Sequence, residues 1–267
     1  MGALSGKTAL VTGSTSGIGR GIALELARAG ARVAVHSLPG DVLAAEAVEE
    51  MQAAGAAEAK FFGADMADPA AIAGLMAEME SWGPLDILVN NAGIQKTAAL
   101  GEMPPESWDA IIAINLSACF HTMRAAMPGM AQRGYGRVIN VASAHGLVAS
   151  KAKAPYVAAK HGLVGLSKVA ALEYADIGSA ETGGVTVNCL APGWTETPLI
   201  EAQIQVAAEA AGGDRAAGIA ALLAEKQPSK RMSAPSEFGA LAVFLCANAC
   251  HNVTGATLPM DGGWTAQ

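Results

Sequence analysis

The stretch that decides the fold runs from residue 8 to residue 30 and reads TALVTGSTSGIGRGIALELARAG. Residues 8–12 form a short apolar run typical of a strand, the glycine-rich turn 13–19 follows, and residues 20–29 have helical periodicity that ends at Gly30. Glycines let the backbone approach a pyrophosphate, whose charge the N-terminus of the next helix favours. This order predicts a dinucleotide site at 13–19, although an ordinary tight turn between strand and helix has the same spacing.

The same alternation continues along the chain. We expect further strands at 32–37, 59–64, 85–89, 136–142, 185–190 and about 256–259, and helices at 42–54, 69–82, around Asn115, at 155–174 and near 236–246. Alternating strands and helices predict an α/β fold: a doubly wound, Rossmann-type, mostly parallel sheet with helices on both faces. No repeat or linker composition divides the chain, so we expect a single domain over residues 1–267.

Composition excludes several classes of protein. Hydrophobic residues make up 52% of the 267 residues and charged residues 15%, which argues against disorder. The net charge of −7 argues against a nucleic-acid partner. The apolar runs are short and interrupted, well below the roughly 20 residues that a membrane span needs, and the first residues lack the pattern of a signal peptide. We therefore expect no membrane partner and a cytoplasmic location.

The cysteines and the polar turns point to a small-molecule site without metal. Cys246 and Cys250 are one helical turn apart, but no second pair of cysteine or histidine completes a metal site, so we expect reduced thiols. Ligands of such sheets bind outside the carboxyl ends of the strands. The turns expected there are 13–19, Asp65, 90–93, 143–145 and 192–194, so the polar features converge on one edge.

Residues 143–160, SAHGLVASKAKAPYVAAK, hold the groups for proton transfer. Tyr156 and Lys160 are one helical turn apart and so point the same way, close to Ser143. A free tyrosine titrates near pH ~10. An ammonium ~4 Å away at an effective dielectric constant of ~20 favours the phenolate by about 4 kcal/mol, as an upper value. We therefore expect Lys160 to lower the pKa of Tyr156 toward neutrality.

These motifs together resemble the short-chain dehydrogenase/reductase family over essentially the whole chain. The residues that carry the resemblance are Thr12-Gly13-xxx-Gly17-Ile18-Gly19, Asn90-Asn91-Ala92-Gly93, Ser143, Tyr156-xxx-Lys160 and Pro192-Gly193. The resemblance implies that Tyr156 transfers the proton of the substrate hydroxyl while a hydride passes to or from a nicotinamide. It also implies that Ser143 binds the substrate oxygen, that Lys160 holds the nicotinamide ribose, and that Asn115 positions a water. A homotetramer is a further expectation of the resemblance.

The resemblance also implies a set of cofactor-binding residues: Gly13, Thr15, Gly17, Ile18, Gly19, Leu38, Asp65, Met66, Asn91, Ala92, Gly93, Tyr156, Lys160, Pro192, Gly193, Trp194 and Thr195. Folds selective for NAD often place an acid at the end of the second strand. Here that strand is followed by Leu38-Pro39-Gly40, and an acid is missing unless Asp41 reaches back. Apart from Arg20, just past the turn, no Arg or Lys is placed to pair with a 2′-phosphate. We expect NAD.

A second set of residues resembles the branch of the family that interconverts D-3-hydroxybutyrate and acetoacetate in bacteria. They are Asn91-Ala-Gly-Ile-Gln95, Ser143-Ala-His145-Gly-Leu-Val-Ala-Ser150, Tyr156-Val-Ala-Ala-Lys160-His161-Gly162, Gly193-Trp194, Glu225-Lys-Gln-Pro-Ser229 and Asp261-Gly-Gly-Trp264. This resemblance implies a small carboxylate substrate bound by Gln95, Ser143, His145, Lys153, Tyr156, Trp194 and Gln203. The residue types fit, because Lys153 supplies a charge, Gln95 and His145 supply donors, and Trp194 supplies an apolar wall.

Two segments and two alternatives remain open. Residues 195–226 are Ala-rich and helix-prone with a break at Gly212-Gly213, and we expect them to form a substrate lid that excludes water. The loop 176–184 looks longer than the family's turn. The alternative substrates are a 3-oxoacyl thioester or a cyclic alcohol, which would leave Lys153 without a partner. A non-catalytic dinucleotide-binding module is the alternative of another class, although a pure binder has no need of Tyr156.

Overall fold

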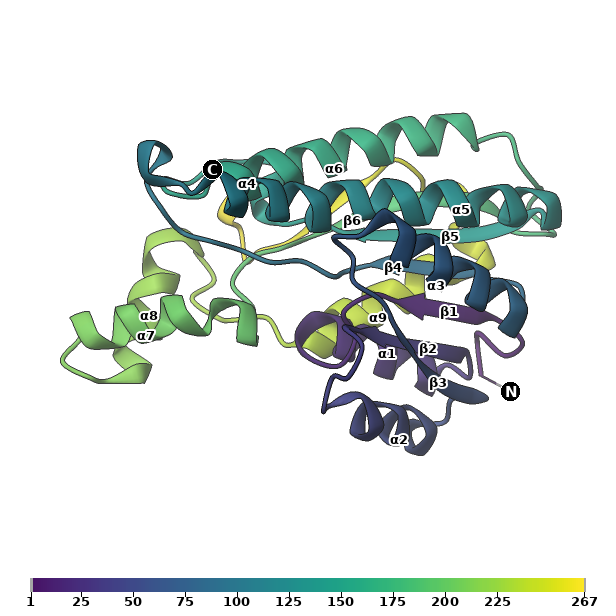
Figure 1. The fold of residues 1–267 in the computed structure, drawn as a ribbon, viewed down its shortest axis with the longest axis horizontal. Helices are drawn as coiled ribbons and strands as arrows, with labels where there is room; N and C mark the ends of the chain where they lie inside the picture. The colour runs from purple at the N-terminus through teal and green to yellow at the C-terminus, as the bar shows by residue number, and fades with distance from the viewer. Residues whose placement is uncertain (1, 267) are drawn as a thin grey trace.

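The strands form one parallel sheet in the computed structural model, which describes residues 2–266 (Figure 1). Within these residues the sheet has seven strands in the order β3-β2-β1-β4-β5-β6-β7, and neighbouring strands pair in parallel. The chain starts at the centre, winds outward to β3, and then crosses to β4 on the other side of β1. The bounds are β1 Thr8–Val11, β2 Arg32–Ser37, β3 Glu58–Gly63, β4 Ile87–Asn90, β5 Tyr135–Val141, β6 Gly184–Pro192 and β7 Thr257–Met260. This topology confirms the predicted doubly wound fold.

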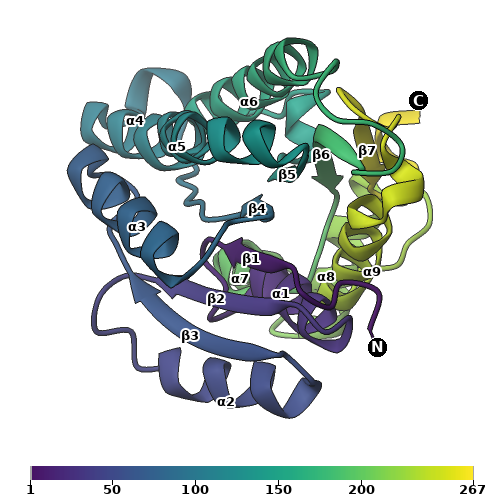
Figure 2. The ribbon, with the colours of Figure 1, turned by 90° about the vertical axis from the view of Figure 1, so that its right-hand side faces the viewer.

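Helices cover both faces of the sheet (Figure 2). One face carries α1 (Gly17–Arg28), α2 (Ala44–Ala54) and α9 (Pro235–Cys246), and the other carries α3 (Pro69–Trp82), α5 (Ala118–Arg133) and α6 (Ala154–Glu173). Successive residues of a strand point to opposite faces, so Leu10 belongs to the core under α3 and α5, while Val11 belongs to the core under α1 and α9. Burial on both faces explains why the central strands β1 and β4 are mostly apolar, whereas the edge strand β3 carries Glu58 and Lys60 at exposed positions.

Helix α4 (Pro105–Ile112) continues into α5 through a π-helical turn, Ala113–Ser117, and Figure 1 shows the two running end to end. The resulting helix has 29 residues, and one 18-residue window reaches a mean hydropathy of 1.3. By length and composition it could therefore cross a membrane. The uninterrupted apolar runs are short, so the sequence predicted no such helix. However, 44% of that window is buried, and α5 packs against β5 and α3 as a core helix does.

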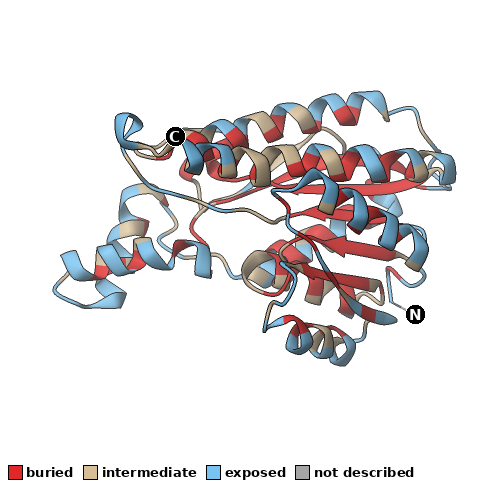
Figure 3. Ribbon diagram, in the orientation of Figure 1, coloured by how far each residue is buried: buried red, intermediate tan, exposed pale blue. Residues whose placement is uncertain are grey.

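The expected lid segment is a pair of helices that projects from the sheet (Figure 1). Helices α7 (Glu201–Ala210) and α8 (Arg215–Lys226) pack on each other, and their outer surface is largely exposed (Figure 3). Gly212 and Gly213, with φ values of 73° and 91°, make the turn between them at the predicted break. The closing motion of this pair remains a prediction.

Most predicted elements agree with the structure to within a few residues. Helix α1 begins at Gly17 and not at residue 20, so the end of the predicted glycine turn already belongs to the helix. The long loop before β6 is organised by Ser179, whose N–H donates to Thr182 Oγ1 over 2.8 Å. Short helical turns occupy Leu100–Glu102, Ala144–Gly146, Pro198–Ile200, Asn248–Cys250 and Trp264–Ala266.

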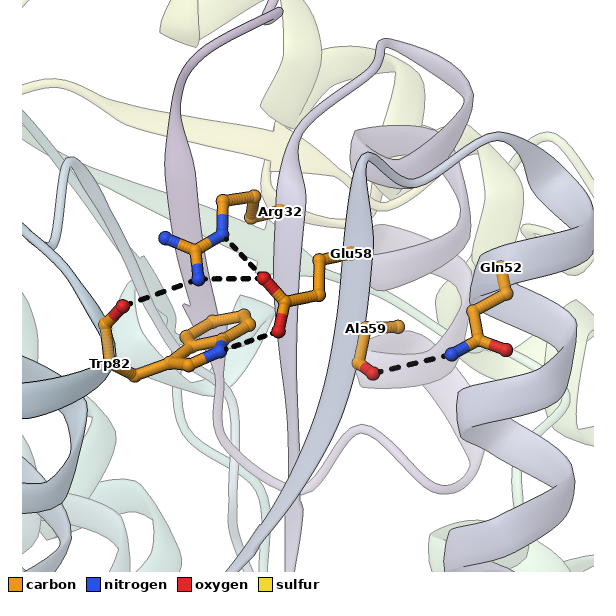
Figure 4. A network of polar contacts seen from close by, with 5 residues as sticks. All are labelled: Arg32, Gln52, Glu58, Ala59 and Trp82. Atoms are coloured by element: carbon orange, nitrogen blue, oxygen red, sulfur yellow. Dashed lines mark hydrogen bonds and ion pairs between the residues drawn. The ribbon is translucent and has the colours of Figure 1, made fainter.

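The amino ends of β2 and β3 are joined by a polar network (Figure 4). Arg32 Nη2 donates to Glu58 Oε2 over 2.7 Å, and the indole Nε1 of Trp82 donates to Glu58 Oε1 over 2.9 Å. The Arg32 guanidinium also lies 4.1 Å from the centroid of the Trp82 ring. These contacts tie α3 to one end of the sheet and leave the opposite end, where the carboxyl ends of the strands meet, for the site.

Candidate active site

The turn between β1 and α1 is closed so tightly that its glycines cannot carry side chains. Gly13 and Gly17 have φ values of 63° and 55°, in the region that favours glycine. A Cβ on Gly19 would lie 2.3 Å from Gly13 O and 2.4 Å from Asn91 Nδ2. Ser16, the N-cap residue of α1, makes no side-chain capping bond. The first N–H groups of α1 are therefore available to an anion, and the turn fits a pyrophosphate.

Side chains that directly follow β1 and β4, together with one from β2, hold this turn. Asn91 Nδ2 donates to Thr12 O over 2.9 Å and to Gly13 O over 3.0 Å, while Thr12 Oγ1 accepts from Asn91 N and Ala92 N. The Nδ1 atom of His36 accepts from Gly13 N over 3.2 Å. Burial lowers the pKa of His36 to about 4, so this acceptor is present at neutral pH.

A cavity of about 750 Å³ extends from this turn across the carboxyl ends of the strands. All the residues predicted to bind the cofactor line it except Gly19, which packs behind the turn; those lining it are Gly13, Thr15, Gly17, Ile18, Leu38, Asp65, Met66, Asn91, Ala92, Gly93, Tyr156, Lys160, Pro192, Gly193, Trp194 and Thr195. All seven predicted substrate residues line it as well: Gln95, Ser143, His145, Lys153, Tyr156, Trp194 and Gln203. The cavity has room for a dinucleotide and a small acid, and its residues fit a nicotinamide cofactor.

Helix α6 brings Tyr156 and Lys160 to the wall of the cavity, beside Ser143 at the end of β5. Tyr156 is buried, and the Nζ atom of Lys160 lies 5.6 Å from the centroid of its ring. Lys160 Nζ donates to Val141 O over 2.7 Å. The helix thus presents a phenol and an ammonium to the same cavity, as their spacing predicted.

The electrostatics of Tyr156 differ from the prediction. Burial raises the pKa of Tyr156 to about 12, and a hydrogen bond with Ser143 only partly offsets this. Burial also lowers the pKa of Lys160. The prediction assumed an ammonium ~4 Å away as the dominant effect. Lys160 instead directs its charge to Val141 O, and desolvation of the phenolate dominates. Tyr156 is therefore a protonated phenol at neutral pH in this state.

Asn115, the fourth predicted catalytic residue, does not line the cavity. It lies fully buried in the π-helical turn between α4 and α5, where its side chain forms a pair of hydrogen bonds with the backbone of Ile94. Ile94 N donates to Asn115 Oδ1, and Asn115 Nδ2 donates to Ile94 O, each over 2.9 Å. Asn115 therefore holds the segment that carries Gln95, and its role toward a water remains a prediction.

Three buried donor atoms have no hydrogen-bond partner among the described residues, and each belongs to a residue that lines the cavity. They are Gln95 Nε2, His145 Nε2 and Trp194 Nε1, and they come from the loops after β4, β5 and β6. Burial lowers the pKa of His145 to about 3, so the ring is neutral at physiological pH. The tautomer with hydrogen on Nε2 leaves Nδ1, 3.4 Å from Ser143 Oγ, to accept from the hydroxyl. Buried polar atoms without partners are rare, and these three mark a place for acceptor atoms.

Lys153 supplies a cation to the same part of the cavity. It is buried, and its Nζ atom donates to Gln203 Oε1 of the lid helix α7 over 2.8 Å. The ammonium also lies 5.4 Å from the centroid of the Trp194 ring. Burial, followed by the charge of Lys226, lowers the pKa of Lys153 to about 8. At neutral pH the cavity therefore contains an ammonium whose partner is a neutral amide oxygen.

Trp264 ends the motif Asp261-Gly-Gly-Trp264 and was not among the predicted site residues. It lines the cavity, with its ring 6.1 Å from that of Trp194 in a stacked arrangement and 5.1 Å from the His145 ring. A large aromatic residue after two glycines close to the end of the chain was the available signal. Its position against the loops after β5 and β6 depends on the tertiary structure alone.

Near the glycine turn the cavity is lined by one acid, Asp65, and a second acid, Asp41, contacts the lining residue Thr15. Asp41 reaches back to the glycine turn, where Thr15 Oγ1 donates to Asp41 Oδ2 over 2.8 Å. Hydrogen bonds from Ser37, Leu43 N and Thr15 lower the pKa of Asp41. Arg20 pairs with Glu46 and Glu50 over 2.7 and 2.5 Å and does not line the cavity. Between residues 2 and 266 no three His, Cys, Asp or Glu side chains gather as a metal site.

Comparison with known proteins identifies the family of the whole chain. A model of the family described as short chain dehydrogenase matches residues 7–207. The D-beta-hydroxybutyrate dehydrogenase of Cupriavidus necator is 54% identical over 265 residues, covering 99% of this chain and 100% of that protein. The enzyme of the same name from Rhizobium meliloti is 44% identical over 262 residues, covering 98% and 99%. A solved gluconate 5-dehydrogenase from Burkholderia cenocepacia, in complex with NADP and tartrate, has a TM-score of 0.85 at 34% identity, covering 99% of this chain and 97% of that one.

Proposed function

The chain belongs to the short-chain dehydrogenase family of oxidoreductases, and we propose that it interconverts D-3-hydroxybutyrate and acetoacetate with NAD. Two relatives that align over almost their whole length carry the name of this activity. The observation that carries the proposal is the cluster of Lys153 and three unpartnered donors beside Tyr156.

This cluster suits the carboxylate of a short hydroxy acid. A carboxylate has two acceptor oxygens, and it gains most from donors that are already desolvated and aimed at it. Lys153 would supply the charge, while Gln95, His145 and Trp194 would supply N–H groups. Without substrate, Gln203 Oε1 accepts the hydrogen bond of the Lys153 ammonium in the way that a carboxylate oxygen would.

The proton path is proposed from Ser143, Tyr156 and Lys160. In the reducing direction, the Tyr156 hydroxyl donates its proton to the carbonyl oxygen of acetoacetate. The Ser143 hydroxyl would turn from His145 Nδ1 to donate a hydrogen bond to the same oxygen. In the oxidising direction, Tyr156 accepts that proton. The nicotinamide, when bound, supplies or accepts the hydride. The raised pKa of Tyr156 favours the proton-donating form at neutral pH. Lys160 would hold the ribose, and Asn115 would keep the Gln95 segment in place.

A 3-oxoacyl thioester or a cyclic alcohol fits the cluster less well. Neither substrate presents a carboxylate at a short distance from the reacting oxygen, so Lys153 would stay buried with only an amide as its partner. An unpaired buried cation is costly. A binding module without catalysis would have no use for Tyr156 in the wall of the cavity.

The experiment that tests this function is an initial-rate assay with the D and L acids. We expect NADH formation with D-3-hydroxybutyrate and none with L-3-hydroxybutyrate. Lys153→Ala should raise the KM for the acid by about 100-fold, as loss of a buried charge partner does. Lys151→Ala, two residues away on an exposed position, is the matched control and should be unchanged. No turnover of the D acid would refute the proposal.

NAD is proposed over NADP because of the charges near the glycine turn. Asp65 lines the cavity near the glycine turn, and Asp41 contacts Thr15 of that turn. Within residues 2–266 the Lys or Arg side chains that line the cavity are Lys153 and Lys160, which belong to the part of the cavity beside Tyr156. A 2′-phosphate near the glycine turn would meet like charge. Asp41→Asn should therefore raise kcat/KM with NADP relative to NAD by about tenfold, measured with both cofactors in parallel. An unchanged ratio would contradict the role of Asp41.

Quaternary structure and location are proposed from the surface and the thiols. Four large apolar side chains on the outer side of α4, α5 and α6 are 41–78% exposed: Trp108, Phe120, Val169 and Leu172. Such a surface supports assembly into the homotetramer that the family resemblance implies.

The four cysteines are free and buried, which supports a reducing compartment such as the cytoplasm.

A further inference from the structure

The segment after α8 contains one buried polar side chain that the proposed chemistry does not use. Gln227 exposes 1% of its surface, and its backbone N–H donates to Leu223 O over 2.8 Å at the end of the lid helix. It does not line the cavity. A buried amide outside the site costs free energy unless both its donor and its acceptor are used. The partners of Gln227 therefore indicate what it holds together.

The Gln227 amide joins the lid exit to the wall of the cavity. Its Oε1 atom accepts from Trp194 N over 2.9 Å, and its Nε2 atom donates to Arg231 O. A main-chain N–H can only donate and a carbonyl can only accept, so these partners define the orientation of the amide. The lid exit is also tied to the Trp194 loop by Ser233 N, which donates to Trp194 O over 3.0 Å.

Two glycines bring the tryptophan loops onto this side chain. A Cβ on Gly193 would lie 2.7 Å from Gln227 Oε1, and a Cβ on Gly262 would lie 2.7 Å from Gln227 Cγ. The loop that carries Trp194 and the loop that carries Trp264 thus both approach Gln227 by their backbones. The two indoles stack with an interplanar angle of 25°. The Gln227 side chain is therefore in contact with both loops that carry the stacked indoles.

We propose that Gln227 is a positioning residue that transmits the state of the lid to Trp194 and Trp264, and so sets the apolar slot for the methyl end of a short hydroxy acid. The proposal rests on the proposed function for the identity of the substrate. When α7 and α8 move, their exit at residues 227–231 moves with them, and the Gln227 amide carries the Trp194 backbone along. The lid and the substrate wall then adopt their closed arrangement together.

The test compares Gln227→Met, which keeps the length of the side chain but makes no hydrogen bond, with Gln227→Glu, which keeps an acceptor for Trp194 N. Gln205→Met, at an exposed position on α7, is the matched control. We expect the KM for D-3-hydroxybutyrate to rise by about tenfold or more in Gln227→Met, less in Gln227→Glu, and not at all in Gln205→Met. The KM for NAD should rise by less than the KM for the acid in Gln227→Met, because Trp194 is one of many residues predicted to bind the cofactor, whereas Trp194 and Trp264 together form the wall of the substrate end.

Two readouts do not depend on turnover. The near-UV circular dichroism of the stacked indoles should weaken in Gln227→Met and persist in Gln227→Glu and the control. Trypsin should cut after Lys230 and Arg231 faster in both Gln227 variants. Equal increases in both KM values, or an unchanged indole signal in Gln227→Met, would overturn the inference. If Gln227→Met does not fold, Gln227→Glu tests the inference. Its cleavage by trypsin should be faster than that of the wild type, and its KM for D-3-hydroxybutyrate should rise more than its KM for NAD. If the wild type does not turn over the acid, the proposed function fails while these two readouts still judge the coupling.

Discussion

Lys153 carries the charge of the proposed substrate site, and its protonation depends in part on Lys226 of the lid helix α8. Burial and the Lys226 ammonium lower the pKa of Lys153 to about 8. A carboxylate binds the ammonium form, which predominates below this pKa. Substrate affinity is therefore expected to be present below about pH 8 and to be lost as the pH rises through that value. The KM for the acid should rise on the alkaline side.

Replacing Lys226 by Gln tests this assignment. Removing a nearby positive charge favours the ammonium form of Lys153, so the pKa of Lys153 should rise toward the ordinary value of a lysine, 10.5. The alkaline rise in KM should then move to higher pH, as measured by a pH profile of KM for D-3-hydroxybutyrate. Lys230→Gln removes an exposed charge near the same loop and should leave the profile unchanged. A profile that does not move in Lys226→Gln would mean that another group titrates.

The lid helices depend on a close contact at the scale of one element. A Cβ on Gly218 of α8 would lie 2.5 Å from Ala208 N of α7, so the two helices meet backbone to backbone. Gly218→Val should force them apart and withdraw Gln203 from Lys153. The strain of overpacking is about 1–3 kcal/mol. We expect the KM for the acid to rise about tenfold with little change in the KM for NAD.

The matched control for the lid is Ala217→Val, which adds the same kind of branched side chain at an exposed position of α8. It should leave both KM values unchanged. If Ala217→Val and Gly218→Val behave alike, the close contact at Gly218 would not be the cause of the effect. Helix propensity cannot produce equal effects, because valine is a weaker helix former than alanine and a better one than glycine. Selective loss in Gly218→Val alone would support the lid as the substrate-binding element.

Strand β5 holds a cation that joins three elements at the amino end of the sheet. The Arg137 side chain is 1% exposed and donates to Gly136 O, Gly184 O, Gly183 O and Ala247 O. These carbonyls belong to β5, the start of β6 and the end of α9. A single substitution of Arg137 therefore removes the hydrogen-bond donor of all four carbonyls at once.

Arg137→Ala should therefore lower the free energy of unfolding by about 3–5 kcal/mol. For a chain of this size that corresponds to a fall in Tm of roughly 6–20 °C. Differential scanning calorimetry measures it, with Arg124→Ala on the exposed side of α5 as the control. A change of less than about 1 kcal/mol would show that water replaces the guanidinium at these carbonyls.

The whole molecule is expected to assemble through the outer side of α5 and α6. Val169 and Leu172 are 52% and 78% exposed on α6. Introducing two carboxylates with Val169→Glu and Leu172→Glu should place unpaired charges in a buried interface and shift a tetramer toward smaller species. Light scattering after size-exclusion chromatography measures the mass. Val206→Glu, at an exposed apolar position of the lid, should not change it.

Local sequence patterns determined the elements and their order. Apolar runs of four to seven residues flanked by glycine turns specify strands buried on both faces, and the alternation with helices leaves a parallel sheet as the simplest topology. The turn at 13–19, the break at Gly212-Gly213 and the pairing of Tyr156 with Lys160 on one helix are local, because they follow from backbone freedom and helical spacing. The predicted roles of the site residues still await the experiments above.

Tertiary structure alone decided the electrostatics and the walls of the site. The pKa of Tyr156 rises where the sequence predicted a fall, because burial depends on everything packed around the ring and not on the spacing to Lys160. Trp264 reaches the substrate end and Gln227 contacts the backbone of Trp194, both from distant parts of the chain, and no local pattern encodes these contacts. Spacing along a helix specifies neighbours within one turn, whereas desolvation and contacts between loops arise only when the whole chain has folded.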